Sequence, residues 1–197
     1  MVYIHLLNGL VYNNQSSFVL GIVIILSSYL NYVLKHDISK PIFSLFQDYI
    51  PLLGRGSRPD GAVDCGYFTN CPNQKAKSFG FPSGHSQFAG INAGFLIREI
   101  ISKKSKNKSF SGLGRSDKIS VLLIFMTIPI MMYSRIYIEG CHTVEQTIFG
   151  SIIGYFIGYT SYGYYHQYKE KISNYINLNS AYTKLILLLV FILLFNY

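Results

Sequence analysis

The chain has 197 residues, of which 50% are hydrophobic and only 13% are charged. An ordinary soluble domain has about 25% charged residues, so this composition argues against one and indicates membrane-spanning helices. In a soluble protein the net charge of +8 would suggest nucleic acid as a partner. Here the basic residues lie in a few loops between apolar runs. That placement fits a membrane protein with an anionic substrate, and we expect no nucleic-acid partner.

Five apolar runs are candidates for membrane spans, which need roughly 17–25 residues. Arg98 lies near one end of the second run, where it can reach the interface, and Pro129 predicts a kink in the third. Residues 1–13 are too short to span, so we expect an interfacial or loosely packed segment. The pattern predicts an all-α fold, a single multi-pass transmembrane helical bundle over residues 1–197. Its spans are about 17–34, 86–102, 119–138, 144–164 and 181–197.

Small residues recur every fourth position in the fourth run, at Gly150, Gly154 and Gly158. This spacing lets two helices approach closely in lipid. We interpret these glycines as a packing surface rather than as part of a site.

The loops predict an orientation. The short loop 102–118 holds six basic residues and one acidic residue, and a loop this basic should be cytoplasmic. The inserted loop 36–81 would then face the lumen of the endoplasmic reticulum, another endomembrane compartment or the cell exterior. It is also basic, which breaks the positive-inside expectation unless some of its charges have a function.

Cysteine usage agrees with this orientation. Cys65 and Cys71 lie six residues apart in the inserted loop, a spacing that permits a small disulfide loop in an oxidising compartment. Two free thiols are the alternative, and Cys141 can compete for pairing.

Polar residues suited to phosphate chemistry gather in three clusters at predicted helix ends. Because the chain crosses the membrane twice between the second and third clusters, all three are predicted on one face. The clusters are Lys35 with Arg58-Pro59, then Pro82-Ser83-Gly84-His85, then Ser134-Arg135 with His142 and Gln146.

These residue types match the needs of phosphoryl transfer. Lysine and arginine can neutralise a phosphate dianion, and Ser83 and Gly84 open a helix whose free N–H groups form an anion site. His85 and His142 supply a proton donor and a nucleophile. The sequence shows no carboxylate cluster of metal-ligand type, so we expect neither a metal nor another cofactor.

As a set, the clusters resemble the type 2 phosphatidic acid phosphatase superfamily. This superfamily includes lipid phosphate phosphatases, dolichyl-diphosphate phosphatases and glucose-6-phosphatase, and soluble vanadium haloperoxidases share its site. The resemblance covers about residues 28–160, and PSGH at 82–85 matches in full. It implies His142 as the residue that forms a phosphohistidine, His85 as the general acid and Gln146 as the residue that orients His142. It implies a phosphate site made of Lys35, Arg58, Ser83, Gly84 and Arg135.

The chain departs from the family pattern in three places. About sixteen extra residues, 41–56, precede Arg58; we predict an inserted interfacial helix there and keep Arg55 as an alternative to Lys35. Six residues separate Arg135 from His142 where five are usual, which predicts a local bulge. Most members have six helices, whereas five spans are counted here.

The resemblance implies a metal-independent phosphatase that acts on a phosphorylated lipid, either a prenyl diphosphate or a phosphatidic-acid-like lipid. One alternative is a sugar-phosphate phosphatase similar to glucose-6-phosphatase. The other is a catalytically inactive membrane lipid-binding protein, whose expected mark is loss of a histidine. Both histidines are present.

Overall fold

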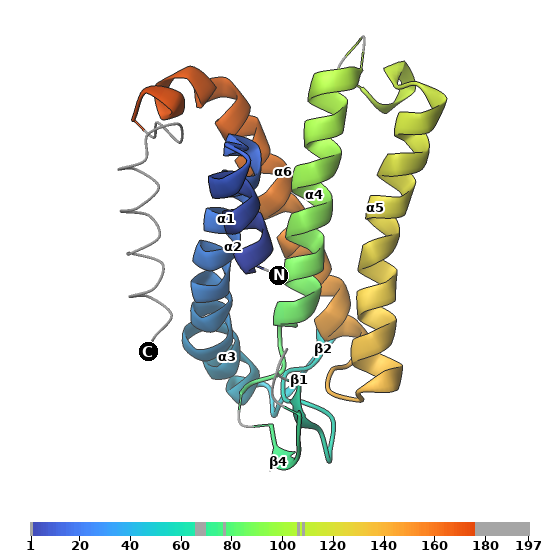
Figure 1. Ribbon diagram of the computed structural model, residues 1–197. Helices are drawn as coiled ribbons and strands as arrows, with labels where there is room; N and C mark the ends of the chain where they lie inside the picture. Colours follow the sequence, from blue (N-terminus) through green and yellow to red (C-terminus); the bar gives the residue numbers. More distant parts are fainter. Residues whose placement is uncertain (1, 66–69, 77, 106, 108, 176–197) are drawn as a thin grey trace.

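The computed structural model describes residues 2–65, 70–76, 78–105, 107 and 109–175 (Figure 1). These residues are mostly helical. The α-helices are α1 (Val2–Val11), α2 (Gln15–Val33), α3 (Lys40–Leu45), α4 (Gly84–Lys104), α5 (Arg115–Tyr133) and α6 (Val144–Tyr175). The remaining helical elements are two π-helical turns, η1 (Leu34–Ser39) and η3 (Ser134–Ile138), and one 3-10 turn, η2 (Phe110–Gly112). Two antiparallel hairpins pair β1 (Tyr49–Ile50) with β2 (Gly54–Arg55) and β3 (Val63–Cys65) with β4 (Asn70–Lys75).

The long helices α2, α4, α5 and α6 form a bundle (Figure 1). They overlie four of the predicted spans, and the fifth, 181–197, lies outside the described residues. Within the described part, two helical stretches are apolar and long enough to cross a membrane, Gln15–Leu45 and Arg115–Ile138. The count of five spans therefore stays a prediction.

Helix α5 turns most of its apolar side chains outward. In water, so many exposed apolar side chains on one helix would mark an interaction surface. In a bilayer, lipid chains would cover the same surface. The large apolar side chains exposed on α5 are Ile119, Leu122, Leu123, Phe125, Met126, Ile130 and Tyr133.

Helices α4 and α6 meet backbone to backbone. A Cβ atom at Gly150 would strike the backbone of Ser83, and one at Gly154 would strike Gln87. On the α4 side of the contact, Gly90 and Gly94 abut the backbone of α6. The glycines predicted as a packing surface are thus confirmed in that role. The contact sets the register, so that the start of α4 lies level with residues 150–151 of α6.

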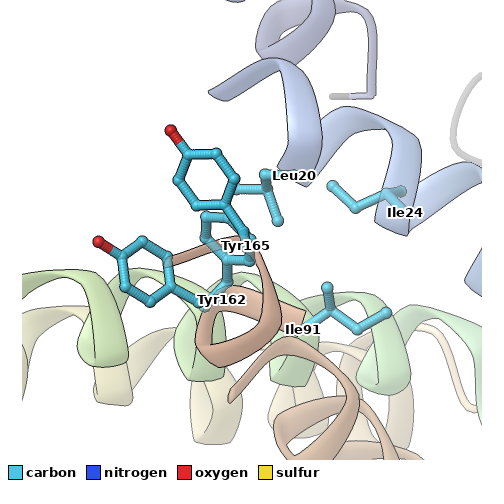
Figure 2. Close-up of a cluster of buried hydrophobic side chains, with 6 residues drawn as sticks. Leu20, Ile24, Ile91, Tyr162 and Tyr165 are labelled. Atoms are coloured by element: carbon cyan, nitrogen blue, oxygen red, sulfur yellow. The ribbon is translucent and has the colours of Figure 1, made fainter. Parts of the chain in front are cut away.

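A cluster of buried side chains fixes α2 against this pair. Leu20 and Ile24 of α2 meet Ile91 of α4 and Tyr162 of α6 (Figure 2). The Phe95 and Tyr162 rings pack edge to face, with centroids 5.1 Å apart. The helix ends that carry the polar clusters are therefore held in fixed positions.

Helix α1 packs more closely than the sequence suggests. It folds back along α2, where Leu6, Leu10 and Phe18 form a small buried cluster. Gly21 of α2 abuts the Leu6 side chain. The expectation of loose packing is wrong for residues 2–11, whereas their interfacial position stays a prediction.

The inserted residues 41–56 do not form one helix. Helix α3 ends at Leu45, and a hairpin follows. Gln47 and Asp48 adopt positive φ angles of 53° and 68°, which stop the helix. The Asp48 carboxylate then accepts a hydrogen bond from the Ser57 backbone N–H at 2.8 Å. The predicted interfacial helix is correct only as far as Leu45.

Candidate active site

The predicted site residues lie at one end of the bundle. There α2 runs on into η1, α4 begins, α5 ends in η3 and α6 begins, with both hairpins at the same end (Figure 1). The basic loop after α4 lies at the opposite end. Helix α4 has 21 residues, a length of about 32 Å, which is close to the ~30 Å hydrocarbon core.

Ser83 starts α4. Its backbone is extended (ψ 118°), and its side chain accepts from the Ser86 N–H at 3.4 Å and from the Ser86 hydroxyl at 3.1 Å. The Ser83 N–H donates to the Gln146 carbonyl at 2.9 Å. This cap leaves the first-turn N–H groups of α4 directed out of the helix end. These N–H groups have the orientation that the predicted anion site at PSGH requires.

The hydrogen bonds of Gln146 define which nitrogen of His142 carries the proton. The Gln146 Nε2 donates to the carbonyls of Arg55 and Ser57 at 2.9 and 2.7 Å. Its Oε1 is therefore the atom 2.9 Å from His142 Nδ1, and it accepts a proton from that nitrogen. His142 Nε2 then carries the lone pair. It lies 3.4 Å from Arg58 Nη1, which can only donate.

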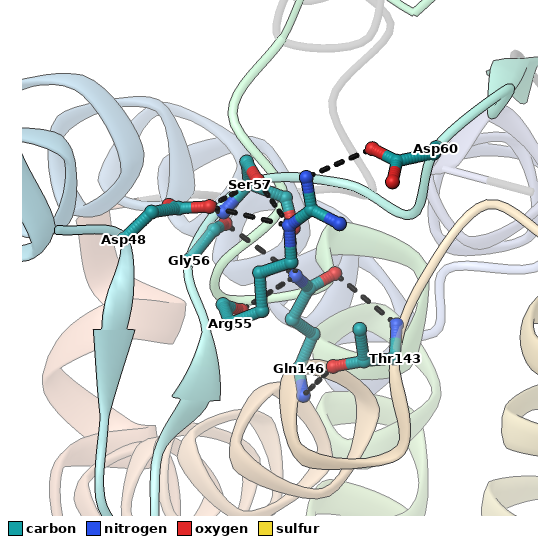
Figure 3. Close-up of polar contacts among 7 residues, drawn as sticks. All are labelled: Asp48, Arg55, Gly56, Ser57, Asp60, Thr143 and Gln146. Atoms are coloured by element: carbon teal, nitrogen blue, oxygen red, sulfur yellow. Dashed lines mark hydrogen bonds and ion pairs between the residues drawn. The ribbon is translucent and has the colours of Figure 1, made fainter.

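Gln146 joins two parts of the site that are far apart in sequence. It is fully buried, and its amide group connects the start of α6 to the segment that precedes Arg58 (Figure 3). A carboxylate at this position could orient His142 but could not donate to the Arg55 and Ser57 carbonyls. The glutamine therefore suits this loop.

Arg58 is held against His142. Its Nε and Nη2 donate to the carbonyl and hydroxyl of Ser78 at 3.0 and 2.7 Å. Its Nη1 donates to the Cys141 carbonyl at 3.2 Å. A phosphate in front of His142 Nε2 would therefore meet a guanidinium that is already oriented.

The structure brings Lys35 rather than Arg55 to the histidines. Lys35 is buried in η1, and its charge acts on both His85 and His142. Arg55 instead pairs with Asp48 at 3.3 Å and Asp60 at 2.9 Å. These two carboxylates raise the pKa of Arg55.

Arg135 lies in η3, buried beside His85. It forms an ion pair with Glu139 at 2.5 Å, and its charge acts on His85. The Arg135 carbonyl accepts from the N–H groups of Cys141 and His142 at 3.0 and 3.3 Å. The bulge predicted between Arg135 and His142 is this π turn, which takes an extra residue into the helix.

Burial and the neighbouring cations lower the pKa of both histidines. Burial, then the charges of Arg135, Lys35 and Arg58, lower the pKa of His85 to about 3. Burial and Arg58 likewise lower the pKa of His142 to about 3, against the hydrogen bond that His142 donates to Gln146, which raises it. The site therefore combines two imidazoles that favour the neutral form with three cations, an arrangement that favours binding of an anion.

Sequence reasoning missed several supporting residues. Ser78, Asp48 and the pair Asn31–Gln87 act through contacts between distant segments, and Asn31 Nδ2 donates to Gln87 Oε1 at 2.7 Å. Only Glu139 could have been found from the local sequence, because it lies four residues after Arg135, the spacing of an ion pair along a helix.

Cys141, which precedes His142, is part of a disulfide. The sequence reading gave this residue only as a competitor for pairing. The predicted Cys65–Cys71 bond rests on side chains outside the described residues.

These side chains bring three cations and two histidines together at one end of a helical bundle, a combination suited to a phosphate group. The model of the PAP2 superfamily matches residues 16–170, and the chain belongs to that superfamily. Membership confirms the resemblance and implies phosphatase activity on phosphate esters. No curated protein and no solved structure matches the chain.

Proposed function

We propose that this protein is a membrane-embedded phosphatase that hydrolyses a phosphorylated lipid through a phosphohistidine at His142. One observation carries the proposal: Gln146 fixes the His142 tautomer so that the Nε2 lone pair faces Arg58. An imidazole held this way can attack phosphorus without first losing a proton. The outward apolar surface of α5 supports embedding in a membrane.

The reaction has two steps. His142 Nε2 forms a bond to phosphorus while the bond from phosphorus to the lipid oxygen breaks, and His85 passes to that oxygen the proton that the substrate's phosphate group brings into the site. Water then attacks the phosphohistidine, the bond from phosphorus to His142 breaks, His85 takes the water proton, and phosphate leaves with that proton. Positioned cations stabilise the charge that develops on the phosphoryl oxygens. The groups proposed for this role are the side chains of Lys35, Arg58 and Arg135, the Ser83 hydroxyl and the N–H groups at Gly84.

Trapping the intermediate tests this mechanism. Protein incubated with a lipid phosphate carrying a radioactive phosphoryl group and then quenched in alkali should retain label, because phosphohistidine survives base and is lost in acid. His142→Ala should retain none. His166→Ala is the matched control, because His166 stacks on Tyr162 far along α6. Label on the His142→Ala protein would refute the assignment.

A panel of substrates tests the proposed substrate class. Purified protein should hydrolyse prenyl diphosphates or phosphatidic acid faster than glucose 6-phosphate. The reverse order would favour the sugar-phosphate reading. Absence of turnover on every substrate, with ligand binding retained, would favour an inactive lipid-binding protein.

We also propose that the site faces the lumen or the cell exterior. The basic loop 102–118 lies at the end of the bundle opposite the site, and basic loops stay cytoplasmic. The sequon at Asn107 should therefore remain unmodified in eukaryotic cells, whereas one engineered around Asn73 should carry a glycan. A glycan on Asn107 would invert this orientation.

A further inference from the structure

An apolar groove of about 290 Å³ lies between α5 and α6. Phe125, Ile128 and Met132 line it from α5, and Ile148, Ser151 and Ile152 are among the residues that line it from α6.

The groove exists because α5 packs on α4 more than on α6. Leu113 and Val121 lie in one buried cluster with Ala93 and Ile97 of α4. Helices α4 and α6 meet separately, at their glycines. The α6-facing side of α5 is therefore left partly uncovered.

One end of the groove lies near the candidate site. Ile128, Met132 and Arg135 are spaced by four and three residues, so they lie on one face of α5 and its continuation. On the other wall, Ile148 lies two residues after Gln146. The end of the groove formed by Met132 and Ile148 thus lies within one helical turn of Arg135 and Gln146. From Phe125 to Arg135 is ten residues, or about 15 Å along the helix.

We propose that this groove holds the hydrocarbon chain of the substrate. The proposal rests on the function above, in which His85 protonates the lipid oxygen, so the chain must leave the site on the side of His85. The volume lies at the low end of ligand pockets, which begin near roughly 300 Å³. It fits one chain rather than two, which favours a prenyl-type phosphate or diphosphate over a two-chain phospholipid.

The groove acts by alignment more than by affinity. A lipid chain is already surrounded by hydrocarbon in the bilayer, so moving it into the groove buries no further surface from water. Holding the chain fixes the phosphate in line with His142, and a misplacement of about 1 Å can cost roughly a hundredfold in rate.

Filling the groove tests the proposal. Ile152→Trp adds bulk at a partly exposed groove position, and Ile130→Trp adds the same bulk at an exposed position on α5 outside the groove. Each variant is assayed with farnesyl phosphate and with phenyl phosphate, which has no chain. Ile152→Trp should lower kcat/KM for farnesyl phosphate at least about tenfold and leave phenyl phosphate turnover unchanged. Ile130→Trp should change neither.

The outcomes separate the two proposals. If the wild type hydrolyses neither substrate, the proposed function fails. If it hydrolyses both and the two variants behave alike, or if Ile152→Trp slows both substrates equally, the groove is not the chain site. As a second measurement, an alkyl phosphonate with a diazirine on its chain should label Phe125–Met132 or Ile148–Phe156. Labelling confined to other helices, or cross-links between two copies through this groove, would overturn the inference.

Discussion

Replacing Gln146 with glutamate tests which of its two roles contributes more to activity: donating hydrogen bonds from its amide to the loop before Arg58, or orienting His142. A carboxylate would hold the His142 Nδ1–H and stabilise the imidazolium, so this effect alone predicts a faster enzyme. The structure predicts a slower one. Glutamate cannot donate to the carbonyls of Arg55 and Ser57, which Gln146 Nε2 contacts at 2.9 and 2.7 Å.

The magnitude follows from those two bonds. Each buried carbonyl left without a donor costs about 1–3 kcal/mol, so the free energy of unfolding should fall by roughly 2–6 kcal/mol. The same segment leads into Arg58, and a shift of about 1 Å at a positioning group can cost roughly a hundredfold in rate. We therefore expect kcat/KM to fall about a hundredfold in Gln146→Glu. Gln146→Leu, which also loses tautomer control, should fall further, by about 10³–10⁴.

Steady-state hydrolysis and thermal unfolding in the same detergent measure both effects. Gln167→Glu is the control, because it makes the same change at an exposed position near the other end of α6. A Gln146→Glu protein as stable and as active as the wild type would refute the reasoning.

Three further predictions concern charge. Arg58→Ala should lower kcat/KM by about 10²–10³. Arg55→Ala should lower kcat/KM less than about tenfold, because the Arg55 guanidinium already forms ion pairs with Asp48 and Asp60. Equal losses of kcat/KM in the two variants would contradict this assignment. Activity should survive EDTA and be inhibited by orthovanadate. Loss of activity on chelation, with recovery in Mg²⁺, would show that the cationic side chains alone do not stabilise the transferred phosphoryl group. Since the pKa values of His85 and His142 are lowered to about 3, the proton for an alcohol leaving group must arrive with the substrate. For a phosphate monoester, kcat/KM should fall about tenfold per pH unit above the ester's second pKa near 6, and a flat profile up to pH 9 would contradict this.

The sequence predicted the features that depend on local patterns. PSGH places a capping serine before a helical run, and the α4 start at Gly84 follows from it. Apolar runs located α2, α4, α5 and α6 because each exceeds the length of an ordinary buried helix. The clusters that alternate with these runs also identified the residues that meet at one end of the bundle.

Features that depend on distant contacts could not be predicted in this way. Asp48 ends a helix and binds Ser57, yet its positive φ is uncommon for a residue other than glycine and has no reliable local signal. The bond from Gln146 to the Arg55 carbonyl spans 91 positions in the chain. The close packing of α1 on α2 also depends on tertiary contacts, because a mostly apolar helix of ten residues is compatible with an interface as well as with a core.

The π turns account for part of the altered spacing. Lys35 lies in η1 and Arg135 in η3, so both helices that deliver a buried cation widen at that residue. A π turn adds one residue without breaking the helix. In η3 the Arg135 carbonyl accepts from both Cys141 and His142, which returns His142 to the arginine despite the one extra residue. In η1 the turn joins α2 to α3 through Pro41, whose ring would clash with the carbonyl four residues earlier in a regular helix. The sixteen extra residues before Arg58 are instead taken up by α3 and the β1–β2 hairpin, and the bond from Gln146 to the Arg55 carbonyl ties the end of that hairpin to α6.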